Sequence, residues 1–374
     1  MKKTIYKYFF HEFIRYFAIV LFAFSAVIWT IQAVNFLDLV TEDGHAFRVY
    51  IHYSFLTIPK ILTKLTPFSF LIAAVLTILK FEKDNELIIL WSSGLNKIHV
   101  ANLLFKISLL VMIFQIFMAN IINPISLNSS RSVLKNSELQ FVPSLLKEKN
   151  FNDTLKGLTI FVDNKNSSGE YENIFIRDDK NILTKVSSNS STIFAKSGYL
   201  KEDEKKLILL DGNIQRLKEN GSISVVKFKR TEINLGGIST KSISEPKIQE
   251  TSTIQIIKCL QRKNVNMHNC EDTVKGRKDI KIEINKRFGV PIFIPLIALI
   301  CCFLLSSLRE KKFSSWKNYF YFFICFSILI ISEVTVRYSG NSINHTFIYY
   351  LLPVVLSILV YLFLIKNFKY ENLN

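Results

Sequence analysis

The chain has 374 residues, 49% of them hydrophobic, and a formal net charge of +17. Its mean hydropathy is +0.25, and its apolar residues gather in six long runs. An ordinary cytosolic protein would not carry six such runs, because about 20 apolar residues are enough to cross a bilayer. The composition therefore excludes most soluble enzymes. The net charge has to be sorted by position, since lysine is abundant along the whole sequence.

The six apolar runs form two groups of three, on either side of the polar residues 126–286. They cover approximately Tyr16–Phe36, Ile58–Leu79, His99–Ile122, Phe288–Leu308, Trp316–Val336 and Thr346–Ile365. The first run is longer than the apolar core of a signal peptide, about 7–15 residues, so we expect it to remain as a span. We predict an α-helical polytopic membrane protein. Residues 1–125 would hold transmembrane helices 1–3, residues 126–286 an inserted domain, and residues 287–374 helices 4–6.

Basic residues in short connections predict the orientation, because lysine and arginine collect on the cytoplasmic side of a membrane. They precede the first span, lie between the fourth and fifth, and follow the sixth: Lys2, Lys3, Lys7, Arg15, Arg309, Lys311, Lys312, Lys317, Lys366 and Lys369. The short connections on the other side carry only Arg48 and Arg337. We therefore expect both termini in the cytoplasm and the large insert outside the cell membrane.

The insert contains short runs rich in Ile, Val, Leu and Phe. The expected strands are Leu158–Asp163, Asn173–Arg177, Thr192–Ala195, Leu207–Leu210, Ile214–Leu217 and Val225–Phe228. Turn signals separate them at Ser168-Gly169, Ser197-Gly198, Asp211-Gly212 and Asn220-Gly221. Short strands with regular turns are typical of sandwiches, so we predict an all-β, jelly-roll-like extracytoplasmic domain with flanking helices. Its positive charge fits either a solvated surface or affinity for anionic lipid headgroups.

Two of the five cysteines, Cys259 and Cys270, lie in the insert, whereas the other three lie in apolar runs. We expect the two to form a disulfide if the insert faces an oxidising compartment, and to be free thiols otherwise.

Several charged residues lie close to the outer ends of the spans. Lys60 and Lys64 stand early in the second span, where long side chains can snorkel to the headgroups. Glu333 and Arg337 are four residues apart in the fifth, which predicts an ion pair on one helix face.

The sequence has no recognisable catalytic constellation. It contains neither a phosphate-binding Gly-x-x-x-x-Gly-Lys-Ser/Thr loop nor a Gly-x-Ser-x-Gly elbow. The pair His11-Glu12 lacks the second histidine of a zinc-protease helix, and His268 near Cys270 is a weak metal signal by itself. We therefore expect no catalytic residue, no metal and no cofactor. Any work done by this chain would draw on a partner or an ion gradient.

The connection between the second and third spans, residues 82–97, predicts a short amphipathic helix. Asp84 is suited to the N-cap position, and Gly94 is suited to end the helix. Leu87, Leu90 and Trp91 fall on one face at helical spacing. Such a helix either lies on the lipid surface or docks onto a partner.

This connection resembles the "SEL-x-x-x-x-A-x-G" coupling helix of the LptF/LptG permease family, with Asn85-Glu86-Leu87 and Ser92-Ser93-Gly94-Leu95 at the matching positions. The resemblance extends over nearly the whole chain. It includes Tyr6–Phe9, Gln32–Leu39, Pro67, Glu283–Pro291 and Arg337–Asn341. The last two segments are more similar to LptF than to LptG.

The resemblance implies a permease subunit of an ABC transporter that extracts lipopolysaccharide from the bacterial inner membrane. The implied partners are an LptG-like permease, an LptB-like ATPase dimer, an LptC-like single-span protein and a periplasmic LptA-like bridge, with no nucleic acid. Glu86, with Leu87, Leu90, Trp91 and Gly94, would belong to the ATPase-coupling helix. Lys60, Lys64 and Arg337 would bind the phosphates of the lipid. Some relatives have basic residues late in the first span, where this chain has Gln32 and Asn35.

Two other interpretations use the same layout. A membrane sensor or scaffold would bind a ligand with its outer β domain and recruit a partner through the short cytoplasmic helix. A sensor normally carries a sizeable cytoplasmic output domain, whereas the cytoplasmic segments expected here are all short. A membrane-embedded transferase would need paired catalytic residues, which the sequence lacks.

Overall fold

The computed structural model describes residues 2–41, 46–137, 146, 148–155, 158–166, 169–179, 190–201, 206–217, 222–234, 247–261, 270, 274–305 and 311–371. Its contacts divide the chain into two compact units. The first comprises Met1–Ile31, Leu56–Asn128 and Pro246–Asn374, and the second comprises Gln32–Phe55 and Ser129–Glu245. The expected division at residues 126 and 287 stays a prediction. Arg309, the Asn220-Gly221 turn and His268 lie outside the described residues.

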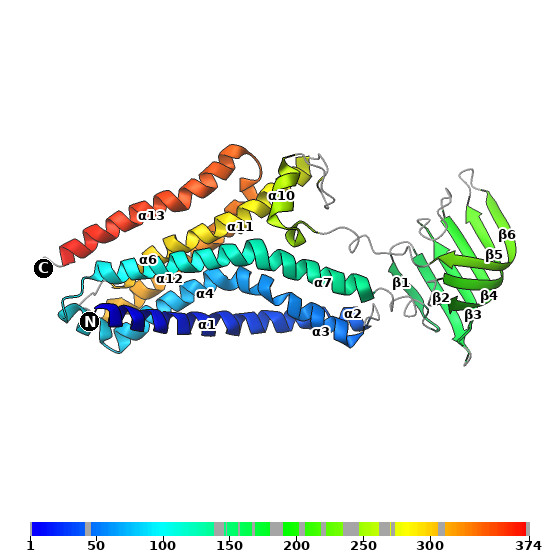
Figure 1. The fold of residues 1–374 in the computed structure, drawn as a ribbon, viewed down its shortest axis with the longest axis horizontal. Coiled ribbons are helices and arrows are strands. Elements are labelled where there is room, and N and C mark those ends of the chain that lie inside the picture. Colours follow the sequence, from blue (N-terminus) through cyan, green and yellow to red (C-terminus); the bar gives the residue numbers. More distant parts are fainter. Residues whose placement is uncertain are drawn as a thin grey trace. The chain divides into compact units, whose positions relative to one another are not determined.

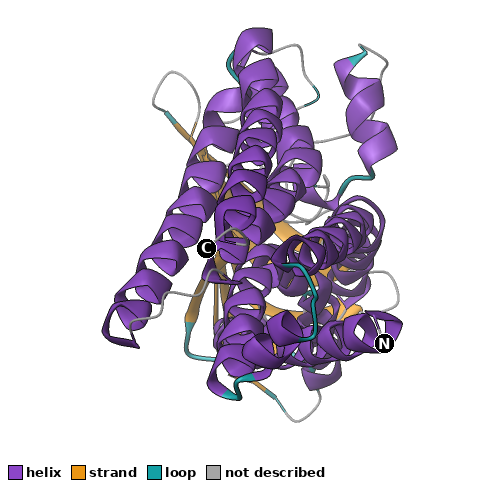
Figure 2. Cartoon of the chain, turned by 90° about the vertical axis from the view of Figure 1, so that its left-hand side faces the viewer, coloured by secondary structure: helices purple, strands orange, loops and turns teal. Residues whose placement is uncertain are grey.

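Long helices lying side by side make up the first unit (Figures 1 and 2). They are α1 (Lys2–Asn35), α4 (Ile58–Lys83), α6 (Lys97–Phe117), α11 (Val274–Cys301), α12 (Lys311–Ser339) and α13 (Ile343–Glu371). Shorter elements extend or connect them: α5 (Glu86–Ser92), η1 (Met118–Ile122), α7 (Asn123–Ser137), η4 (Ile248–Glu250), α10 (Thr253–Leu260) and η5 (Cys302–Leu305). Two further helices, α2 (Asp38–Thr41) and α3 (Phe47–Leu56), precede α4 in the chain.

Six segments of the described chain are long and apolar enough to cross a membrane. They are Thr4–Val40, Phe47–Lys83, Lys97–Leu134, Gly276–Leu305, Asn318–Ser339 and Ile343–Lys369. Four of them contain one of the expected apolar runs, and the other two overlap Phe288–Leu308 and Trp316–Val336 over most of their length, so six helices suited to cross a membrane lie where the sequence predicts them. Helices suit this environment because their backbone hydrogen bonds are all made within the segment.

Helix α11 is the centre of the first unit and packs against α4, α6, α12 and α13. Residues 293–305 are all buried, and a stretch that is buried on every side is an interior one. Gly289 allows close packing here, because a Cβ at this position would meet the ring of Tyr349 in α13. Four of the other long helices therefore assemble around α11.

A buried arginine, Arg287, attaches η4 and the start of α10 to α11. Its side chain is only 4% exposed, and acceptors lie within reach of all five of its N–H groups. Nε donates to Glu283 Oε1 (3.0 Å), Nη1 to Thr251 O (3.1 Å) and Thr253 Oγ1 (2.9 Å), and Nη2 to Ile248 O (3.2 Å) and Gln249 O (3.3 Å). A charge buried with this set of partners is stable only while the partners stay in place.

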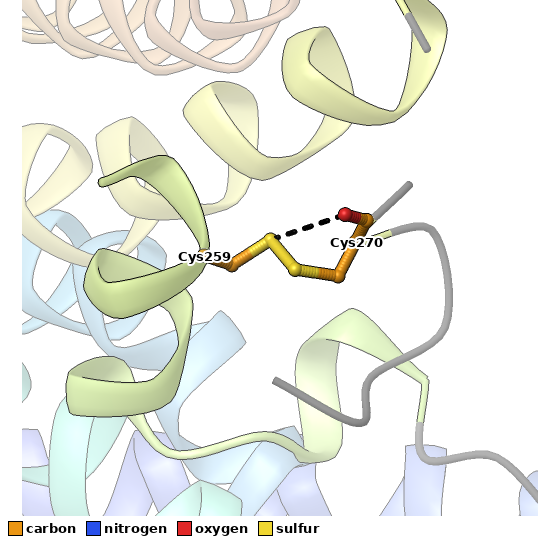
Figure 3. Close-up of a disulfide and its surroundings, with 2 residues drawn as sticks. All are labelled: Cys259 and Cys270. Atoms are coloured by element: carbon orange, nitrogen blue, oxygen red, sulfur yellow. Dashed lines mark hydrogen bonds between the residues drawn. A yellow bond between two sulfur atoms is a disulfide. The ribbon is translucent and has the colours of Figure 1, made fainter. Parts of the chain in front are cut away.

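Three further contacts hold the same segment. Thr253 Oγ1 donates to Asn120 Oδ1 of η1 at 2.9 Å, and Ile256 packs on Ile280 of α11 in a small apolar cluster. A disulfide joins Cys259, in the last turn of α10, to Cys270 (Figure 3). Of the two alternatives for these cysteines, the structure therefore has the bonded one.

The second unit contains a six-stranded antiparallel sheet in which each strand pairs with its neighbours in the sequence. The strands are β1 (Phe151–Leu155), β2 (Leu158–Lys165), β3 (Tyr171–Asp178), β4 (Ser190–Lys201), β5 (Lys206–Leu217) and β6 (Ile223–Asn234). Alternate residues of β2, such as Leu158, Ile160 and Val162, are buried in the core of this unit. The expected antiparallel β domain is confirmed. Its closure into a jelly roll stays a prediction.

Two expected turns in this domain are wrong. Ser197-Gly198 lies inside β4, and Asp211-Gly212 lies inside β5, which runs unbroken through the two strands expected there. The glycines serve close packing instead. A Cβ at Gly198 would lie 2.6 Å from the carbonyl oxygen of Ile208, and a Cβ at Gly212 would meet a neighbouring carbonyl oxygen in β4.

Replacing Arg287 by alanine should destabilise the first unit by about 3–5 kcal/mol, because Glu283 and four other acceptors lose their buried partner. Arg287→Lys keeps the charge but cannot reach five acceptors in a planar fork, so it should recover only part of the loss. The midpoint of thermal unfolding in detergent measures both effects. Lys278→Ala, at an exposed position of the same helix, is the matched control and should unfold like the native protein. An unchanged midpoint for Arg287→Ala would contradict the stabilising role of the Arg287 contacts with η4 and α10.

A maleimide added to intact cells should label Cys259 and Cys270 only after treatment with a reductant, because the disulfide leaves no thiol to react. The double variant Cys259→Ser/Cys270→Ser should show no gain of label on reduction, which assigns the signal to this pair. Labelling before reduction would mean that the bond is absent in the cell. Labelling that requires lysis of the cells would place α10 on the cytoplasmic side.

Candidate functional site

The first candidate site is α5, the short helix between α4 and α6. Its start differs from expectation, because Asp84 caps the end of α4 and does not form the N-cap of α5. Asn85 holds the N-cap position with a left-handed φ of 59° and no capping bond from its side chain. Asparagine tolerates this conformation better than most residues, and it lets the chain reverse within two residues.

Gly94 ends α5 as expected. Its φ of +80° is in the left-handed region that glycine adopts without strain. The N–H of Gly94 donates to Trp91 O at 3.1 Å, and the N–H of Leu95 donates to Leu90 O at 3.2 Å. These two bonds form a Schellman motif, in which the residue after the glycine also packs back on the helix. Leu95 is accordingly buried, which ties the end of α5 to the bundle.

The two faces of α5 have different roles. Leu87 is buried in the core of the first unit, and Leu90 and Trp91 pack partly against that core. Lys97 lies over the Trp91 ring, 5.9 Å from its centroid. On the opposite face Ile88 and Ile89 are each 63% exposed. Leu87 therefore seats the helix, Leu90 and Trp91 are half-buried, and two isoleucines that sequence reasoning passed over are exposed. The coupling role expected for Glu86, Leu87, Leu90, Trp91 and Gly94 stays a prediction.

Polar contacts connect α5 and the end of α4 to the first helix. Tyr8 Oη of α1 donates a hydrogen bond to Glu86 Oε1 at 3.1 Å. Lys80 Nζ, near the end of α4, lies 2.7 Å from Oε2 of Glu12 in an ion pair whose carboxylate is almost fully buried. Helix α1 thus contacts the first residue of α5 through Tyr8. One turn later in α1, Glu12 contacts the end of α4.

The second candidate site lies at the other end of α4. Lys60 and Lys64 are both exposed and stand one turn apart. Lys60 is within electrostatic range of Glu250 and Glu283, which attract its ammonium group, and of Lys64 and Lys247, which repel it. The fold therefore gathers three lysines and two carboxylates from α4, η4 and α11. An anionic ligand would compete with the carboxylates for the lysines.

Polar contacts fix the start of α4, and hence the backbone that carries these two lysines. Gln115 Nε2 of α6 donates to Thr63 O at 3.2 Å, and Thr63 Oγ1 lies 3.2 Å from Asn123 Oδ1. Ser126 Oγ of α7 donates to Leu56 O at 2.6 Å. These contacts are buried or half-buried, so breaking them would leave polar atoms unsatisfied.

The expected ion pair between Glu333 and Arg337 is wrong. Glu333 pairs with Lys286 of α11, whose Nζ lies 3.1 Å from Oε1 of the carboxylate. Arg337 is exposed and makes no ion pair with any described residue. Two helices, not two turns of one helix, supply the partners of Glu333.

Within the described residues no group of three or more His, Cys, Asp or Glu side chains lies close enough to hold a metal ion. The buried sulfur atoms of Cys301 in α11 and Cys325 in α12 lie 3.8 Å apart, and the two residues do not form a disulfide. The described residues therefore supply two surface sites, α5 and the lysine cluster, and no assembled metal-ligand set.

Comparison with known proteins identifies the architecture. One protein-family model, described as lipopolysaccharide export system permease LptF/LptG, matches residues 7–367. The chain belongs to the LptF/LptG family. It is also 25% identical over 375 aligned residues to an uncharacterized protein of Rickettsia prowazekii (strain Madrid E), covering 96% of this chain and 98% of that protein.

Membership of the LptF/LptG family confirms the resemblance found in the sequence and makes the chain a membrane permease of lipopolysaccharide export. The six potential spans and the antiparallel β domain agree with that assignment. The match includes α5, the lysines of α4 and Arg337, because all of them fall between residues 7 and 367.

Proposed function

We propose that this chain is the LptF-type subunit of an ABC transporter that extracts lipopolysaccharide from the bacterial inner membrane. In this proposal it pairs with an LptG-like permease and is driven by an LptB-like ATPase dimer, so the chain itself is not an enzyme. The observation that carries the proposal is α5. One face of this seven-residue helix packs on the core through Leu87. Its exposed surface carries Ile88 and Ile89, and Glu86 is its first residue.

The physical properties of α5 suit a docking element. Burial of Leu87 and the Schellman end at Gly94 hold the helix in one orientation, so little entropy is lost when a partner binds. Exposed Ile88 and Ile89 offer apolar area to a groove, and Glu86 offers a charge-assisted hydrogen bond at its edge. A partner that moves this rigid helix also moves the ends of α4 and α6.

The lysine cluster and Arg337 support an anionic substrate. A cation at the headgroup level meets a phosphate with little added desolvation, and a hydrogen bond to a charged group contributes about 1.5–3 kcal/mol. Lys60 has neighbouring carboxylates, and both Lys60 and Lys64 are exposed at the surface, so an entering phosphate can compete with those carboxylates. Late in the first span the chain has Gln32 and Asn35, so phosphate binding rests on the other helices.

The remaining parts of the proposal follow from the family. Both termini and α5 would face the cytoplasm, and the β domain would form a jelly roll in the periplasm. Lipopolysaccharide would pass from the membrane to this domain and then to an LptA-like bridge, with an LptC-like single-span protein beside the two permeases. The disulfide at Cys259 supports an oxidising compartment for the segment that carries α10.

Glu86→Ala should weaken binding of the ATPase about tenfold, because a charge-assisted contact is lost at the docking surface. The measurement is the amount of ATPase that co-purifies with the permease pair, together with its rate of ATP hydrolysis. Asp84→Ala, which removes an exposed carboxylate just before α5, is the control and should bind normally. Full binding and hydrolysis by Glu86→Ala would refute the docking role of Glu86.

Arg337→Glu should reduce photo-crosslinking of lipopolysaccharide at the outer end of α12 at least tenfold, because a donor is replaced by a charge that repels phosphate. Arg337→Lys keeps the positive charge and should retain most of the crosslinking. The experiment uses a photoreactive residue at Tyr338, which is itself exposed. Equal crosslinking in the glutamate and lysine variants would remove Arg337 from the lipid site.

A further inference from the structure

The first half of α1 is attached to the bundle, and the rest of its length in the first unit is largely uncovered. Phe9 and Phe13 are buried and pack on the rings of Phe81 and Phe70 in α4, with centroid distances of 5.2 and 5.3 Å. Beyond Leu21 the large side chains of α1 are mostly exposed, and Phe22 is 64% exposed. Beyond that point the ring of Phe24 still contacts Phe68 of α4, at a centroid distance of 5.5 Å. The buried aromatic contacts of α1 with α4, and its polar ones, therefore lie in its first five turns.

Two polar contacts lie within that attached half. Tyr8 and Glu12 are four residues apart, so they share one face of α1. Tyr8 bonds to Glu86 at the start of α5, and Glu12 pairs with Lys80 near the end of α4. This face of α1 is thus bound on both sides of the turn between α4 and α5.

The hydrogen bond between Tyr8 and Glu86 contributes more to the position of the Glu86 carboxylate than to the stability of the fold. Tyr8 is 42% exposed, and a hydrogen bond open to water adds little to folding. However, it occupies one oxygen of the only charged residue in α5. A carboxylate has two acceptor oxygens, so Glu86 can keep Tyr8 on one of them while a docked protein binds the other.

We propose that Tyr8 and Glu12 are positioning residues that transmit movement of α5 to the first transmembrane helix. This inference rests on the proposed function, in which an ATPase moves α5. A displacement of α5 pulls α1 through Glu86, and Lys80 prevents α1 from sliding along α4. The apolar contacts of Phe9 and Phe13 serve as the pivot, and the uncovered part of α1 swings. In this way the Glu86 carboxylate binds both the ATPase and α1, the helix that the ATPase moves.

The test uses the complete transporter in liposomes, with lipopolysaccharide delivered per ATP hydrolysed as the readout. Tyr8→Phe removes one hydroxyl and keeps the ring that packs against Phe81, 5.5 Å away. It should lower the ratio of transport to hydrolysis at least threefold. Tyr6→Phe is the matched control, because it removes a hydroxyl from the same helix at a position with no hydrogen-bond partner among the described residues. That control should keep the native ratio.

Glu12→Gln is the second variant and should lower the ratio independently, because Lys80 loses its counter-charge. A native ratio in both Tyr8→Phe and Glu12→Gln would overturn the inference while leaving the proposed function intact. Failure of the native complex to transport lipopolysaccharide with ATP would instead reject the proposed function.

A double-mutant cycle separates transmission from a general loss of packing. If Tyr8 acts through Glu86, Tyr8→Phe should have no further effect on the ratio in a Glu86→Gln background. A further drop of the same size as in the native background would show that Tyr8 acts elsewhere, and would overturn the inference.

Discussion

Hydrocarbon supplies no hydrogen-bond partners, so a chain that crosses a membrane must satisfy its backbone N–H and C=O groups internally, and a charged side chain buried there needs partners from its own chain. In this protein two buried charged side chains join helices in this way. Arg287 reaches five acceptors in η4, α10 and α11, and Glu12 is held by Lys80. Between these regions α11 is enclosed by apolar side chains from four other helices. Specific polar contacts thus stand near the ends of the bundle, and packing fills the length between them.

The two candidate sites of this permease of the LptF/LptG family lie at the two ends of α4. At one end, burial of Leu87 leaves Ile88 and Ile89 on the side of α5 that the described residues do not cover. At the other end, lysines accumulate beside carboxylates that are already engaged with Arg287 or lie close to it. Helix α4 runs from the lysine cluster to the α5 turn, so one helix carries residues of one site and leads directly into the other.

Features set by local sequence were predictable, and those set by contacts distant in the sequence were not. The six spans follow from run length and hydropathy, and the end of α5 follows from the left-handed freedom of Gly94. Pairing Glu333 with Arg337 assumed that a neighbour on the same helix was nearest, but α11 brings Lys286 closer. The sequence does not show whether Gly198 and Gly212 allow a turn or allow close packing of neighbouring strands. Glycine suits both situations because it has no Cβ. The stripe Leu87, Leu90 and Trp91 did not show which face of α5 packs on the core, because such a stripe marks the buried face of a helix as readily as a binding face.

The most direct test of the account is ATP-dependent extraction of lipopolysaccharide by the purified complex of this chain with its partner permease and ATPase. Liposomes containing both lipopolysaccharide and phospholipid would be incubated with a soluble acceptor, and the lipid reaching the acceptor would be measured. The account predicts transfer of lipopolysaccharide in the presence of ATP, none with a non-hydrolysable analogue, and none of phospholipid. Transfer that does not depend on ATP, or hydrolysis of ATP by this chain alone, would contradict it.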